Sequence, residues 1–144
     1  MTATIIDTSA ILAAFDESYA EHPAIARTLA ETDDLLLVSP MVVAEADYML
    51  ASRLGPKAAG RFAADIAAEA YDLAEWTASD HAAALAVITG QGDDGDDIGI
   101  ADASNVILAD RHRTTTILAL DQRHFRRLPP QWGASHFTLL PYDA

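Results

Sequence analysis

Residues 3–7 read ATIID, a short apolar run that ends in a carboxylate. Carboxylates are rarely buried unless something compensates their charge, so an acid in this position needs an explanation. Similar patterns occur in SPMVVAEADYML at 39–50, IGIADASNVILA at 98–109 and TTTILALD at 114–121. The acids that end or interrupt these four runs are Asp7, Glu45, Asp102 and Asp121. Their spread along the chain suggests one site that the fold assembles.

Apolar runs of strand length alternate with segments of helix length. Strands are predicted at 3–6, 35–38, 71–76, 116–120 and 136–140. Helices are predicted at 8–15, 21–32, 40–54, 57–69, 79–88 and 100–112. The alternation predicts an α/β layer fold with a mostly parallel sheet, and residues 1–144 are expected to form a single domain. Ligands bind beyond the carboxyl ends of such strands, which is where Asp7 and Asp121 would lie.

Composition limits the classes of function. The 144 residues include no cysteine, which excludes disulfides, Cys-based zinc sites and thiol nucleophiles. Clustered carboxylates without cysteine suit a hard divalent cation such as Mg²⁺ or Mn²⁺. No apolar stretch is long enough for a signal peptide or a membrane span, so a cytoplasmic protein with no membrane partner is expected.

The formal charge of −13 should repel nucleic acid over most of the surface. Five of the nine basic residues fall in one short stretch: Arg111, Arg113, Arg123, Arg126 and Arg127. They form either a local basic rim, able to hold a nucleic-acid backbone, or scattered solvated charges.

Glu45 is placed on a helix face that it shares with Val42, Tyr48 and Met49. A charge in that apolar stripe needs an ion, or an arginine in a salt bridge. Asp47 falls on another face and is interpreted as a solvated charge.

The other three acids each have a structural alternative. Asp7 and Asp121 are placed to cap helices or turns, and Asp102 lies in the first turn of its helix, where the dipole favours a negative charge. Asn105 is interpreted either as orienting Asp102 or as a surface residue. His124 is interpreted as polar surface or a packed edge, with contact to substrate as the alternative.

The segment GQGDDGDDIG at 90–99 is interpreted as a solvated loop. Its spacing does not match a calcium-binding EF-hand, because the twelfth position from Asp94 is Asn105 instead of Glu. Asp97 is the loop acid expected closest to the site.

Taken together, the chain resembles the PIN-domain ribonucleases, and within them the VapC-like toxins of bacterial toxin–antitoxin pairs. Four segments carry the resemblance: IIDTSAILA at 5–13, SPMVVAEADYMLASRLG at 39–55, IGIADASNVILADRH at 98–112 and ILALDQRHF at 117–125. In this resemblance Asp7, Glu45, Asp102 and Asp121 correspond to the family's metal-binding and catalytic acids. One departure is Ala119, where the family often has Thr or Ser. Thr8, Ser9 or Ser104 would then have to supply the hydroxyl.

The resemblance implies a PIN-like three-layer α/β/α fold. It also implies a Mg²⁺-dependent endoribonuclease, in which Mn²⁺ can substitute, with an RNA substrate, a VapB-like antitoxin partner and a homodimer. Whether one or two ions bind, and which RNA is cut, stays open. The alternative function is a catalytically inactive PIN-fold binding module. A phosphoaspartate receiver is disfavoured because the sole lysine, Lys57, lies in a predicted helix, and a structure-specific DNA nuclease usually needs extra clamp elements.

Overall fold

The computed structural model of the chain describes residues 2–92 and 97–143, and within these ranges the backbone forms five strands and seven helices. The strands are β1 (Ala3–Ile6), β2 (Leu35–Val38), β3 (Asp72–Leu73), β4 (Thr116–Leu118) and β5 (Thr138–Leu140). The helices are α1 (Thr8–Phe15), α2 (His22–Glu31), α3 (Pro40–Leu54), α4 (Pro56–Ala67), α5 (Ala78–Thr89), α6 (Ile100–His112) and α7 (Gln122–Arg127). The loop acids Asp93, Asp94 and Asp96 lie outside the described residues.

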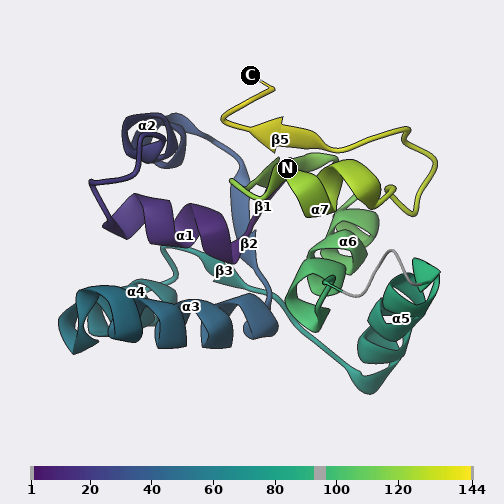
Figure 1. The fold of residues 1–144 in the computed structure, drawn as a ribbon, viewed down its shortest axis with the longest axis horizontal. Coiled ribbons are helices and arrows are strands. Elements are labelled where there is room, and N and C mark those ends of the chain that lie inside the picture. Colours follow the sequence, from purple (N-terminus) through teal and green to yellow (C-terminus); the bar gives the residue numbers. More distant parts are fainter. Residues whose placement is uncertain (1, 93–96, 144) are drawn as a thin grey trace.

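The strands form a sheet in the order β3-β2-β1-β4-β5, and all of the described pairings are parallel. Helices α1 to α4 gather on one side of the molecule and α5 to α7 on the other (Figure 1). The predicted α/β fold with a mostly parallel sheet is therefore confirmed. None of the described helices is long and apolar enough to cross a membrane.

Two apolar cores lie on opposite faces of the sheet, because successive side chains of a strand point in opposite directions. Ile5 and Ile117 belong to the core beneath α5, α6 and α7. Their neighbours Ile6 and Leu118 belong to the core beneath α1 to α4. All four residues are almost fully buried, so the sheet is covered on both faces, as parallel sheets usually are.

Two elements differ from the sequence prediction. The strand predicted at 71–76 pairs only over Asp72–Leu73, because it lies at the edge of the sheet and has a single neighbour. Helix α7 was not predicted, since QRHFRR buries only His124 and Phe125 and so carries no periodic apolar stripe. It forms because Asp121 caps it, accepting a hydrogen bond from the His124 backbone N–H at 3.3 Å.

Helix α3 is fixed at its start by Ser39. The Ser39 Oγ accepts hydrogen bonds from the backbone N–H groups of Met41 and Val42 at 3.1 and 3.3 Å. The same hydroxyl is hydrogen-bonded to that of Ser104 on α6 at 2.7 Å, and both serines are fully buried. Ser39 therefore caps α3 and also joins it to α6.

Ser39→Ala should destabilise the protein by about 1–2 kcal/mol, because it removes the cap and leaves buried N–H groups unpaired. The measurement is urea unfolding of purified protein. Ser52→Ala is the matched control, since Ser52 is exposed on the same helix and bonds only the Tyr48 carbonyl. Equal midpoints for the two variants would contradict the role of Ser39.

Candidate metal centre and active site

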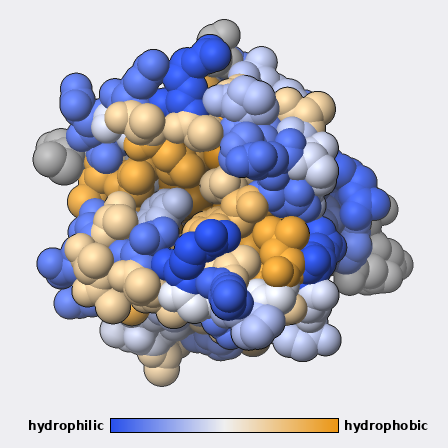
Figure 2. Space-filling view, turned by 90° about the vertical axis from the view of Figure 1, so that its left-hand side faces the viewer, coloured by the Kyte–Doolittle hydropathy of each residue, from blue (hydrophilic) through white to orange (hydrophobic). Residues whose placement is uncertain are grey.

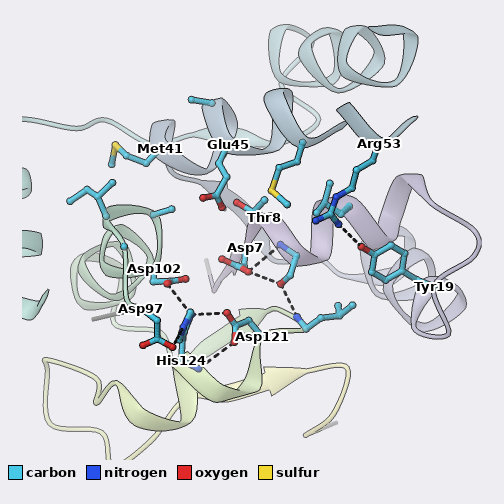
Figure 3. Close-up of a pocket in the computed structure, with 18 residues that line it drawn as sticks. Asp7, Thr8, Tyr19, Met41, Glu45, Arg53, Asp97, Asp102, Asp121 and His124 are labelled. Atoms are coloured by element: carbon cyan, nitrogen blue, oxygen red, sulfur yellow. Dashed lines mark hydrogen bonds and ion pairs between the residues drawn. The ribbon is translucent and has the colours of Figure 1, made fainter. Parts of the chain in front are cut away.

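The four acids singled out in the sequence line one cavity of about 800 Å³ beyond the carboxyl ends of β1 and β4. Each comes from a different segment. Asp7 follows β1, Glu45 lies on α3, Asp102 opens α6 and Asp121 follows β4. Figure 3 shows their side chains around a common space. Segments more than a hundred residues apart in the chain are brought together by the parallel sheet.

Asp7 is the most constrained of the four, with 4% of its surface exposed. Its Oδ2 accepts hydrogen bonds from the Ser9 hydroxyl at 2.5 Å and the Ser9 backbone N–H at 3.1 Å. Its Oδ1 accepts one from Asn105 Nδ2 at 3.0 Å. Burial nevertheless raises the pKa of the Asp7 carboxyl, and the negative charges of Asp121 and Glu45 add to the shift. Asp7 thus caps α1 and faces the cavity at the same time.

Asp102 lies in the first turn of α6, as predicted, with 16% of its side chain exposed. Burial raises the pKa of its carboxyl to about 7, and the charge of Asp7 contributes to the increase. Because the pKa lies this far above its ordinary value, ionising the Asp102 carboxyl costs free energy when no cation is bound. A bound cation would favour the ionised carboxylate and lower the pKa.

His124 is buried, so of the interpretations open for it polar surface is wrong and a packed position holds. Its Nδ1 lies 3.0 Å from an oxygen of Asp102 and 2.7 Å from one of Asp121. Neither contact has the direction of a hydrogen bond, and Nδ1 has no hydrogen-bond partner among the described residues. Its Nε2 lies 3.0 Å from Asp97 Oδ2. Its contact with the acids could not be read from the local pattern, because helix α7 was not predicted.

Asp102, Asp121 and His124 offer ligand atoms that all lie within 4.8 Å of one another, close enough to hold one metal ion. Two further buried oxygens beside the acids, Thr8 Oγ1 and Asn105 Oδ1, have no hydrogen-bond partner among the described residues. Unpartnered buried oxygens and crowded carboxylates both suit a hard cation, either directly or through water.

Glu45 reaches the cavity for a different reason from the one predicted. Its helix face is not an apolar stripe, because Tyr48 is 73% exposed and Glu45 itself is exposed. Val42, in contrast, is completely buried in the core. No salt bridge to Glu45 occurs in the described parts of the chain. Glu45 points from α3 toward Asp7 (Figure 3). Asp47 is exposed, as expected.

Asn105 and Ser9 hold the acids in place. Asn105 was expected either to orient Asp102 or to lie at the surface; it is fully buried and binds Asp7 instead. Ser9 Oγ donates to Asp7 and accepts from the backbone N–H of Leu120 at 2.9 Å, next to Asp121. Ser9 therefore supplies a hydroxyl beside the strand end where Ala119 lacks one, and Ala119 packs in the core.

Each of the five clustered arginines contacts a carboxylate, and only two of them do so beside the cavity. Arg123 and Arg127 contact Asp97 at 2.9 and 3.4 Å, beside the cavity. Hydrogen bonding to His124 is the main cause of the lowered pKa of Asp97, to which Arg123 also contributes. Asp97 lies at the site, as expected. The remaining pairs are Arg111–Asp80, Arg113–Asp110 and Arg126–Asp143.

Comparison with known proteins identifies the class to which this fold and site belong. Residues 4–129 match the PIN domain family. Ribonuclease VapC26 of Mycobacterium tuberculosis is 46% identical over 137 residues, which cover 95% of this chain and 99% of that protein.

Solved structures share the fold. VapC20 of M. tuberculosis, described as a sarcin-ricin loop cleaving toxin, aligns with a TM-score of 0.75 at 21% identity, covering 85% of this chain and 92% of that one. VapBC2 of Rickettsia felis, solved with a promoter DNA fragment, aligns at 0.66 and 17% identity over 90% and 95% of the two chains. The chain therefore belongs to the PIN domain family and, within it, to the VapC ribonuclease toxins.

The raised pKa of Asp102 predicts how stability depends on pH in protein freed of divalent cations. The unfolded carboxyl ionises near pH 4, whereas the folded one keeps its proton until about pH 7. Its contribution to stability is therefore complete below about pH 4 and is lost as the pH rises to 7. Asp102→Asn should gain up to about 4 kcal/mol relative to wild type across this interval, because each pH unit between the two values is worth about 1.4 kcal/mol.

Urea unfolding at several pH values in chelator measures this difference. Asp47→Asn, which removes an exposed acid of α3, should keep the wild-type pH dependence. A constant difference between wild type and Asp102→Asn at all pH values would contradict the burial argument.

Proposed function

We propose that this chain is a Mg²⁺-dependent endoribonuclease toxin that hydrolyses RNA phosphodiester bonds, with Mn²⁺ able to substitute. The observation that carries the proposal is the convergence of Asp7, Glu45, Asp102 and Asp121 on one cavity in a chain of the VapC family. Ribonuclease activity is what the name of the 46% identical relative states.

The residues present fit a divalent cation. Asp102 and Asp121 would hold it most directly, because their oxygens already lie together with His124. Asp7 would join them: its two oxygens accept three hydrogen bonds, and a carboxylate has about four lone-pair sites. Glu45 would complete the set from α3, directly or through water. When bound, the cation would supply positive charge that stabilises the attacked phosphate and favours ionisation of the attacking water.

The protein side chains do the positioning. Ser9 and Asn105 fix the rotamer of Asp7, so its carboxylate loses little freedom when the site fills. His124 packs between Asp102 and Asp121, with its Nδ1 3.0 and 2.7 Å from an oxygen of each. Asp97, in turn, holds the other edge of the imidazole.

A VapB-like antitoxin and a homodimer complete the proposal. Two of the similar structures are VapBC complexes, from Rickettsia felis and Salmonella typhimurium. The side of the molecule formed by α1 to α4 carries apolar surface bordered by hydrophilic side chains (Figure 2). Contiguous apolar surface rimmed by polar residues can mark a protein–protein interaction site, and the apolar face of an antitoxin helix would suit it.

Asp7→Asn and Asp102→Asn should each lower the Mg²⁺-dependent cleavage of RNA by at least about a hundredfold while leaving the fold intact, because each removes a charge from the cation site. The measurement is cleavage of total RNA by purified protein, with circular dichroism for the fold. Asp47→Asn should cleave at the wild-type rate. Wild-type cleavage rates in both site variants would contradict the assignment of Asp7 and Asp102 to the catalytic site. If neither wild type nor any variant cleaves RNA, the inactive binding module is favoured.

Mg²⁺ or Mn²⁺ at millimolar concentration should raise the melting temperature by several degrees, since a ligand that binds only the folded state stabilises it by mass action. Asp121→Asn should lose most of that increase, whereas Asp47→Asn should keep it. Thermal denaturation in chelator and in each cation provides the test, and melting curves indifferent to metal would argue against a carboxylate metal site.

A further inference from the structure

Arg53 and Tyr19 form a polar pair in the wall of the same cavity. Arg53 lies in the last turn of α3, and Tyr19 lies in the connection between α1 and α2. Arg53 Nη1 donates a hydrogen bond to Tyr19 Oη at 3.1 Å. Figure 3 shows the pair at one end of the cavity, with Asp102 and His124 toward the other.

The Arg53 charge has no carboxylate partner within the described ranges, unlike the five arginines of 111–127. This charge acts on the Asp16 carboxyl. Hydrogen bonds from Ser18 are the main cause of the lowered pKa of Asp16, and the charges of His22 and Arg53 are smaller contributions. Because Tyr19 Oη accepts from Arg53, the phenol proton stays available to a further acceptor. The pair therefore presents a cation and a hydroxyl donor to the cavity.

The helix sets the distance between this pair and the acids. Met41, Glu45, Met49 and Arg53 follow one another at intervals of four along α3, and all four line the cavity. Arg53 lies eight positions after Glu45, which corresponds to a rise of about 12 Å along the helix. Glu45 and Arg53 therefore line different parts of the cavity, and a group bound by Arg53 would lie beside the acids and not between them.

We propose that Arg53 and Tyr19 bind the phosphate of a nucleotide next to the one that is cut, and so anchor the RNA strand along α3. The inference rests on the proposed ribonuclease function. Guanidinium groups pair with phosphate through charge-assisted hydrogen bonds, and a tyrosine hydroxyl can add a second donor.

The net negative charge of the protein means that RNA would need a positive group near the cavity. A body of formal charge −13 repels RNA, and the acids that would hold the cation repel it further. A cation on the chain itself, at a fixed distance from those acids, offsets the repulsion where the strand must lie. The cavity wall between them is largely apolar, with Leu12 and Met49 as members, and leaves room for a base or ribose.

The test uses short single-stranded RNA as substrate and compares Arg53→Gln with Arg53→Lys. Both keep a long side chain, but only lysine keeps the charge. Arg53→Gln should raise KM roughly tenfold with kcat little changed, as expected for loss of uniform binding through one charged contact. A plot of log(kcat/KM) against the logarithm of the monovalent salt concentration should have a shallower slope for Arg53→Gln than for wild type. The difference should be about 0.7, the contribution of one phosphate contact on a single strand.

Arg53→Lys should retain the wild-type salt slope and recover part of the KM. Tyr19→Phe should raise KM by a smaller factor and leave the slope unchanged, because it removes a donor and no charge. Arg27→Gln is the control: Arg27 is exposed on α2 and is not among the residues lining the cavity, so it should behave as wild type.

If wild type cleaves RNA and Arg53→Gln shows the same KM and salt slope, the anchor is wrong and the proposed function stands. A changed KM in both Arg53 variants with an unchanged salt slope would show a purely structural role, which also overturns the anchor. Absence of cleavage by wild type in Mg²⁺ and in Mn²⁺ would overturn the proposed function, and the anchor with it.

Discussion

Two strands and two helices of the fold meet at one buried residue, Asp7. Its backbone N–H donates to the Leu118 carbonyl at 3.0 Å and continues the pairing of β1 with β4. Its side chain caps α1 through Ser9 and binds Asn105 on α6. A single residue thus joins two strands and two helices at the point where the cavity opens. Since an unpaired buried charge is very costly, each of these contacts is also a condition for keeping Asp7 inside the fold.

Crowding acids into one cavity costs stability, and the fold offsets that cost in part. His124 lies between Asp102 and Asp121, and Asp97 holds the imidazole while Arg123 and Arg127 hold Asp97. The offset is incomplete, because the pKa of Asp102 still rises to about 7. A carboxyl whose pKa is raised by burial and by a neighbouring negative charge, and which lines a cavity, marks a candidate functional site.

Helix α3 runs along one wall of the cavity and sets the order of the side chains there. It is fixed at its start by the buried Ser39–Ser104 contact, which ties it to the helix of Asp102. From there one face of the helix passes from Met41 through Glu45 to Arg53, so the cavity has an acidic end and a basic end.

The sequence by itself determined the alternation of strands and helices and the presence of Asp7 and Asp121 at strand ends, because apolar periodicity and capping are local properties. It also located Asp102 in a first helical turn. Only the tertiary structure decided the positions of His124 and Arg53. Helix α7 lacks an apolar stripe and forms from its cap and its packing, and the Arg53–Tyr19 contact joins residues 34 positions apart. Neither Glu45 at an exposed helix face nor Asn105 bound to Asp7 follows from local pattern, since both depend on how α3 and α6 pack around the end of β1.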